Sequence, residues 1–203
     1  MATTDLKTTG YSSDTAKHYL LDAGAIFKNV KYDTTTKKYT GEPLGATVGG
    51  SKLNIAIGLR QPEVDGLLTE VKGNDVIESV KATLEGTLKE WKKENIANAL
   101  FADIKDADGT TAPTGYKIIT GRNKVLDSDY ISNIAYVGKI AGESNPVIII
   151  LKNALNTAGL SVETKDKTEA GIPIKFEARA DADKPEDYNG IWQIIYPETI
   201  TTV

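Results

Sequence analysis

The sequence contains no cysteine and only one histidine, His18. Without cysteine the chain has no disulfide, no thiolate ligand for zinc and no thiol nucleophile. A single histidine leaves a hydrolytic triad or a histidine-rich metal site with one candidate at most. Catalysis would then depend on carboxylate pairs, as in glycosidases, and no spacing among the 28 acidic residues singles out a pair. We therefore predict that the protein is not an enzyme and has no catalytic, cofactor-binding or metal-binding residues.

The chain also lacks a basic excess and a long apolar run. It carries 24 Lys and Arg against 28 Asp and Glu, a formal charge of −4, whereas proteins that grip nucleic acid through its phosphates carry a basic patch. The longest clearly apolar run, residues 147–151, is too short to cross a bilayer. The polar start, MATTDLK, does not resemble a signal peptide. These features predict no sequence-specific binding of DNA, no membrane partner and a cytoplasm-like environment.

Two short motifs resemble ligand sites but have the wrong residues at key positions. Residues 45–52, GATVGGSK, resemble a phosphate-binding P-loop, but the serine precedes the lysine, which reverses the order that the motif needs. Residues 106–109, DADG, resemble a calcium loop, but the EF-hand register would place Ile104 and Gly115 where carboxylates are required. Both segments are predicted to be loops or turns.

The two tryptophans raise the alternative of a sugar-binding surface. Trp91 follows Leu88, and Trp192 lies among Ile191, Ile194 and Ile195. Because aromatic side chains beside apolar runs usually bury their rings, we predict that both pack in the core.

What is present is typical of a soluble globular protein, with 40% hydrophobic and 26% charged residues. Residues 1–18 are rich in Thr, Ser, Asp and Lys and predict a flexible N-terminal arm. Residues 19–203 are predicted to form one domain, which begins with a core segment at 19–30.

Periodicity predicts a mainly β protein. Apolar and polar residues alternate over 51–59 and 79–89, as in half-buried strands. Helical spacing over 91–102 places Ile96 and Leu100 on one face, so these two residues are predicted to pack a single short helix against a sheet. Further strands are predicted at 116–121, 130–140, 147–151, 172–180 and 190–196, whereas 152–159 fits a helical turn or a bend. The predicted fold is a β-sandwich or flattened barrel with one flanking α-helix.

Residues 31–50 are predicted to form a long polar loop. Loops of this length inside a compact domain are uncommon and usually functional, so we expect contact with another subunit. The candidate residues are Lys31, Tyr32, Asp33, Thr34, Thr35, Thr36, Lys37, Lys38, Gly45, Ala46, Thr47, Gly49 and Gly50.

A series of short motifs over about a third of the chain resembles a known family. Residues 44–50, LGATVGG, lead into an alternating strand, followed by VDG at 64–66, VKG at 71–73 and the run IESVKATLE at 77–85. In this order and spacing they resemble the major tail proteins (tail tube proteins) of siphophages that infect Gram-positive bacteria. The chain departs from that family at Lys92, where a hydroxyl residue often caps the short helix.

The resemblance implies a structural function. Six β-sandwich subunits would form a ring whose sheets join into an inner barrel, and rings would stack into the tail tube of the virion, assembled in the host cytoplasm. The implied partners are further copies of the chain, the tape-measure protein, the tail-tip and tail-terminator proteins, and DNA passing through the lumen. Two alternatives remain open: a tube subunit of a contractile tail or type VI secretion system, and a carbohydrate-binding or adhesion β-sandwich.

Overall fold

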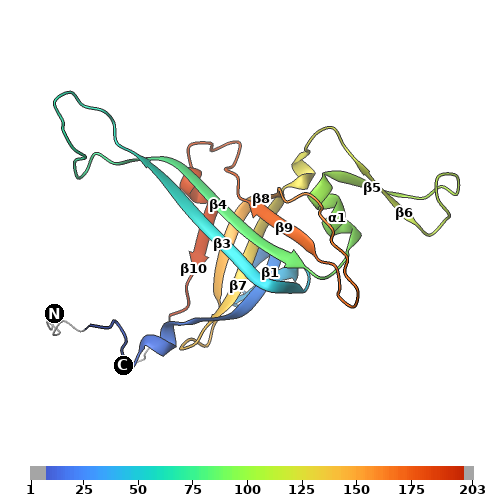
Figure 1. Ribbon diagram of the computed structural model, residues 1–203, viewed down its shortest axis with the longest axis horizontal. Helices are drawn as coiled ribbons and strands as arrows, with labels where there is room; N and C mark the ends of the chain where they lie inside the picture. The colour runs from blue at the N-terminus through green and yellow to red at the C-terminus, as the bar shows by residue number, and fades with distance from the viewer. Residues whose placement is uncertain (1–7, 199–203) are drawn as a thin grey trace.

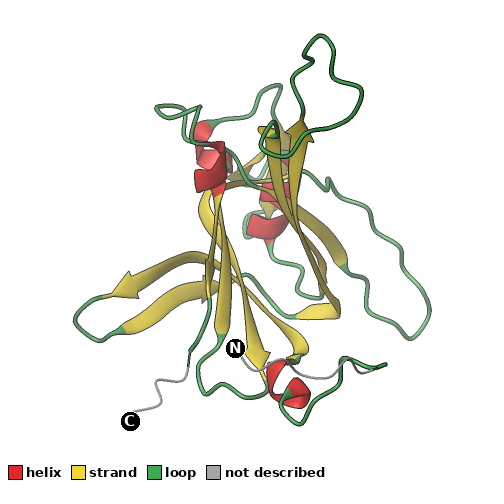
Figure 2. Cartoon of the chain, turned by 90° about the vertical axis from the view of Figure 1, so that its left-hand side faces the viewer, coloured by secondary structure: helices red, strands yellow, loops and turns green. Residues whose placement is uncertain are grey.

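The computed structural model describes residues 8–198, in which strands form the bulk of the molecule and short helical segments lie around them (Figure 2). Its strands are β1 (Leu20–Asp33), β2 (Lys38–Pro43), β3 (Thr47–Arg60), β4 (Val76–Leu88), β5 (Ala102–Asp106), β6 (Lys117–Gly121), β7 (Ile131–Ile140), β8 (Val147–Asn156), β9 (Ile172–Glu177) and β10 (Trp192–Ile195). Its helical segments are the α-helix α1 (Lys93–Leu100) and three 3-10 turns, η1 (Thr15–His18), η2 (Asp127–Asp129) and η3 (Tyr188–Ile191).

The strands are arranged in two layers that share β8. One layer has the antiparallel order β2-β1-β7-β8-β10. The other has the order β9-β4-β3 and joins the first where Leu155 and Asn156, at the end of β8, pair with β9. Strands β3, β4 and β9 cross in front of β1, β7 and β8 in Figure 1. The predicted mainly β, sandwich-like fold is thus confirmed.

The main core lies between the two layers. Ile172, Ile174 and Phe176 of β9 are buried, and the residues between them are partly exposed. Leu84 and Leu88 of β4 face the same core from the neighbouring strand. Each fully buried aliphatic side chain contributes about 1.5–3 kcal/mol relative to exposure, so this alternation is the chief source of stability. The opposite layer completes the core with Ile26, Ile134, Tyr136, Leu151 and Ala154.

A smaller core lies on the opposite face of the β7–β8 layer. Asn29 of β1 has a left-handed backbone (φ 56°), and the backbone pairing of β1 with β7 ends just before it, at Lys28. Beyond this point the side chain of Asn133 bonds to Val30 instead. Its amide group donates to the Val30 carbonyl oxygen (3.1 Å), and its oxygen accepts from the Val30 N–H (2.7 Å). Val30 packs there with Ile148 and Ile150. These contacts hold the later half of β1 against β7 and β8.

The prediction of a long loop over 31–50 is wrong. Most of this segment is strand: β1 continues to Asp33, β2 pairs with it, and β3 begins at Thr47. The turn at 34–37 is closed by the Asp33 carboxylate, which accepts from the Thr35 N–H (2.8 Å). The sequence of β2, KYTGEP, has no apolar alternation, and all six of its residues are exposed. Only its hydrogen bonding to β1 makes this segment a strand.

The helix is shorter than predicted and packs through different residues. It buries Ala97 and Ala99, and Ile96 packs against the main core as predicted. The prediction for Leu100 is wrong, since its side chain is 40% exposed. The helix ends directly after it, at Phe101 in a left-handed conformation (φ 50°), so Leu100 has no further turn to cover it.

Other boundaries differ as well. Strand β8 continues to Asn156, where neither a helical turn nor a bend occurs, and β5 occupies residues predicted to be the helix end and a loop. Trp192 packs against the main core as predicted, but Trp91 is 46% exposed, with its indole N–H donating to the Ala170 carbonyl oxygen (3.0 Å).

The predicted N-terminal arm is only partly described. Residues 1–7 lie outside the described residues. The remainder ends in the turn η1, which is anchored where the Gly142 N–H donates to the Lys17 carbonyl oxygen (2.7 Å).

The packing predicts a clear contrast between two leucines. Leu84→Ala removes a side chain with no solvent exposure and should lower the free energy of unfolding by about 2–5 kcal/mol. Leu100→Ala, the control, should lower it by less than about 1 kcal/mol, as for other surface positions. Urea denaturation of the two variants measures both values, and equal losses would contradict this description of the core.

Candidate assembly interface

Strand β3 is an open edge of the β9-β4-β3 layer. It spans 14 residues and, within the described chain, pairs with β4 alone. Ile57 and Leu59 in its outer half are 47% and 61% exposed. A long strand with an unpaired row of N–H and C=O groups is a template for pairing with another chain, and natural proteins rarely leave one uncovered. This edge is therefore the first candidate contact between subunits.

A glycine bulge marks the start of that edge. Gly49 and Gly50 have φ values of 76° and 79°, and the register with β4 shifts between Val48 and Ser51. An added Cβ at either glycine would meet nothing within 4 Å, so the backbone conformation, and not lack of space, requires glycine. Bulges of this kind bend an edge strand and change its twist. The bulge therefore sets the direction in which β3 leaves the body.

The neighbouring predicted residues hold the chain that enters β3. Gly45 precedes Ala46, whose N–H donates to the Glu90 carboxylate (2.8 Å). The hydrogen bond from Lys92 and that from Ala46 both lower the pKa of Glu90. Gly49 and Gly50 line a shallow hollow on the outer face of β3, β4 and β9.

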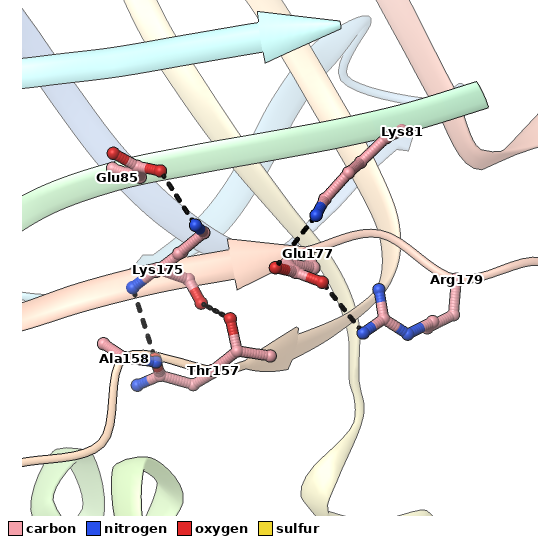
Figure 3. A network of polar contacts seen from close by, with 8 residues as sticks. Lys81, Glu85, Thr157, Ala158, Lys175, Glu177 and Arg179 are labelled. Atoms are coloured by element: carbon pink, nitrogen blue, oxygen red, sulfur yellow. Dashed lines mark hydrogen bonds and ion pairs between the residues drawn. The ribbon is translucent and has the colours of Figure 1, made fainter. Parts of the chain in front are cut away.

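Ion pairs cover the outer face of this layer (Figure 3). Lys175 of β9 lies 3.3 Å from the carboxylate of Glu85 on β4. Glu177 lies between two cations: its oxygens are 3.7 Å from Lys81 and 3.0 Å from Arg179. Three bases thus share two carboxylates, so this network has a formal charge of +1.

Glu177 is the most enclosed of these groups, with a side chain 14% exposed. Its desolvation opposes ionisation, but the hydrogen bond from Arg179 and the charges of Lys81 and Arg179 outweigh it and lower the pKa of Glu177. The carboxylate therefore stays ionised at neutral pH and ties β4 to β9.

The hairpin of β1 and β2 holds the other predicted residues. Lys31, Tyr32, Thr34, Thr35, Thr36, Lys37 and Lys38 are exposed, and Asp33 is half-buried. The rings of Tyr32 and Tyr39 lie 4.9 Å apart across the hairpin. Lys37 and Lys38 line a pocket with residues of β8 and β10, whereas Gly49 and Gly50 line the hollow over β4 and β9. The predicted residues therefore belong to two separate surfaces.

Sequence reasoning missed a third surface, the connection between β3 and β4. Residues 61–75 extend far from the body at the end of this hairpin (Figure 1). Asp65-Gly66 and residues 72–75 signalled turns, but the apolar residues among them were not assigned to any surface. Four of these residues are well exposed: Val64, Leu67, Leu68 and Val71.

The β5–β6 hairpin projects on the other side of the molecule (Figure 1). Its base is held by Arg122, which pairs with the buried Asp129 carboxylate and lies 3.2 Å from Asp103. Asp129 also accepts the N–H of Leu126 (2.8 Å). This internal ion pair fixes the hairpin to the body.

Other kinds of site are not found in this part of the chain. Among residues 8–198, no group of three or more His, Asp and Glu is placed to hold a metal ion. None of the helices within the same residues is long and apolar enough to span a membrane. Comparison of the sequence with protein-family models and with curated proteins finds no match.

The ion pairs of Glu177 predict a pH-dependent stability. A carboxyl group whose pKa is lowered in the folded state stabilises the fold above its unfolded pKa, and this contribution is lost as the pH falls through the folded pKa. Glu177→Gln should therefore lower the free energy of unfolding by about 1–3 kcal/mol at neutral pH. The difference from the wild type should shrink below about pH 4.3, the ordinary pKa of glutamate.

Urea denaturation of both proteins between neutral and acidic pH measures this difference. Lys175→Met, which leaves Glu177 and its two cations in place, serves as the matched control. A difference for Glu177→Gln that stays constant as the pH falls would contradict the assignment.

Proposed function

We propose that this chain is the structural subunit of a bacteriophage tail tube, polymerising as stacked hexameric rings. The observation that carries the proposal is the open edge of β3, 14 residues long and paired on one side only. Closing several copies into a ring covers such edges, because the edge strand of one copy pairs with an edge of the next. The motifs at residues 44–85 that resemble siphophage tail proteins support the same conclusion.

A ring requires β3 to pair with a different edge of the next copy, whereas pairing with β3 of a second copy would give a symmetric dimer. Strand β3 ends one layer, whereas the other layer ends in β2, which has only six residues, and in β10, which has four. Pairing of β3 with a different edge is a heterologous contact, and such contacts generate rings when the rotation closes. The sheets of successive copies would then form one continuous barrel.

The face of β3, β4 and β9 suits the lumen of this barrel. Three of its bases, Lys81, Lys175 and Arg179, are engaged by Glu85 and Glu177. A fourth base on this face, Lys52, is exposed and forms no ion pair among the described residues. Unpaired bases would bind the phosphates of DNA, and each contact would add salt-dependent affinity and friction. The pairing of most of these bases would limit such contacts, so that DNA and the tape-measure protein pass without sequence-specific binding. The tail-tip and tail-terminator proteins would contact the two ends of the tube.

Self-assembly is the direct test. Concentrated protein, alone or with tail tips as nuclei, should form hollow tubes with sixfold symmetry, visible by negative-stain electron microscopy. Fresh protein is expected to be largely monomeric, because assembly must first offset the entropy of ordering exposed segments. Monomers alone under all of these conditions would contradict the proposed function.

Two proline variants test the edge of β3. Successive residues of an antiparallel strand point their N–H groups alternately toward the partner and away from it. Asn54 and Ile57 therefore differ in direction, and both are exposed. Of the two variants Asn54→Pro and Ile57→Pro, one removes an N–H that faces the open edge. This variant should leave the melting temperature of the monomer nearly unchanged and should abolish tubes.

The other proline should lower the melting temperature, since it removes a hydrogen bond to β4. It is the matched control for a general effect of proline. Normal tubes from the variant that keeps its melting temperature would exclude β3 as the contact.

A further inference from the structure

The connection between β3 and β4 is an ordered loop, held by its own polar side chains. The Gln61 side chain spans it, accepting from the Val71 N–H (3.1 Å) and donating to the Asp75 carboxylate (2.9 Å). The Asn74 amide donates to the Pro62 carbonyl oxygen (3.0 Å). Polar side chains thus make the internal contacts of the loop, and apolar ones are left on its surface.

Four apolar residues of this loop are exposed, and together they are called the knob: Val64, Leu67, Leu68 and Val71. Leu68 is fully exposed (102%), and Val64 is 54% exposed. Figure 1 shows the loop extending away from the rest of the molecule, so the chain does not cover the knob itself. Apolar patches on ordered, protruding segments mark sites of contact with another molecule.

A pocket elsewhere on the same chain offers apolar side chains and a basic rim. Its volume is 430 Å³, which accommodates more than one aliphatic side chain. The apolar part of its lining comes from Pro146, Ile148, Ile195 and Pro197, of which Ile148 is only 4% exposed. The rim carries Lys37 and Lys38 from the turn between β1 and β2.

The charges of the two surfaces are opposite. Within residues 61–75 the carboxylates of Glu63, Asp65, Glu70 and Asp75 outnumber the single base Lys72, a formal charge of −3. The described residues that line the pocket include two lysines and no carboxylate. Complementary charge steers association and selects the orientation of two surfaces that meet.

We propose that the knob of one copy docks into this pocket of a second copy, with the acids of the loop facing Lys37 and Lys38. Knob and pocket are different surfaces, so the contact can pass from copy to copy. The inference rests on the proposed self-assembly and names the side chains that make one of its contacts. It also assigns a role to Lys37 and Lys38, which were predicted to lie at a subunit contact as part of a long loop.

Engineered cysteines test the docking in the full chain, because the natural sequence has none. A Leu68→Cys variant mixed with an Asn145→Cys variant should form a disulfide-linked pair on mild oxidation, since Asn145 is exposed and lines the pocket. The control mixes Leu68→Cys with Tyr116→Cys, whose position is 65% exposed beside β6. Non-reducing gel electrophoresis should show several-fold more of the first pair than of the second.

Charge exchange tests the orientation. Lys37→Glu with Lys38→Glu in the Asn145→Cys partner should reduce the yield of the pair. Adding Glu63→Lys and Glu70→Lys to the Leu68→Cys partner should restore it, and high salt should weaken the natural contact. If the yield of the disulfide-linked pair stayed the same after both charge exchanges, the proposal would be overturned.

The outcomes separate this contact from the tube itself. Tubes that form normally while the two cysteine mixtures give equal yields would overturn the docking and leave the proposed function intact. A specific pair without tubes would support the docking and contradict the tube. A specific pair that forms only after residues 199–203 are removed would mean that this segment, and not a second copy, fills the pocket, and would overturn the docking.

Discussion

The hydrogen-bonding capacity of strand edges is the constraint on which this architecture depends. Strand β8 passes from one layer to the other, so the two layers share a strand and enclose one core. This arrangement still leaves β3 at the end of its layer, with one row of backbone groups facing outward along 14 residues. A monomer with such an edge is ready to pair, and in the proposed ring this edge would gain a partner strand from the next copy.

The remaining features divide into those that hold the monomer and those that face outward. Burial of Leu84 and Phe176 and the internal pair of Arg122 with Asp129 need no second copy. The side chains of Leu68, Lys37 and Lys38 are exposed on the surface. Apolar and charged groups placed on ordered protruding segments, and not in the core, are what an assembling subunit needs, because they form contacts only when copies meet.

Strands with alternating apolar and polar residues could be predicted from the sequence, whereas strands that depend only on pairing with a neighbour could not. Strands β4 and β9 were predictable, because apolar and polar residues alternate along each of them. Strand β2 was not, since all of its residues are exposed and only hydrogen bonding to β1 makes it a strand. The candidate contact between subunits was predicted within residues 31–50, which contain Lys37, Lys38 and the glycine bulge at Gly49 and Gly50. The knob was missed because the turn residues at 65–66 and 72–75 predicted only a connection, and no surface was assigned to the apolar residues among them.

Hydrogen–deuterium exchange of the β3 amides tests the central claim most directly. In the monomer, the amides of residues 53–57 that face β4 should exchange slowly and those that face the open edge should exchange quickly. In assembled protein the second group should become protected as well, because each N–H gains a partner on the neighbouring copy. Unchanged fast exchange at the open edge in assembled protein would contradict the account.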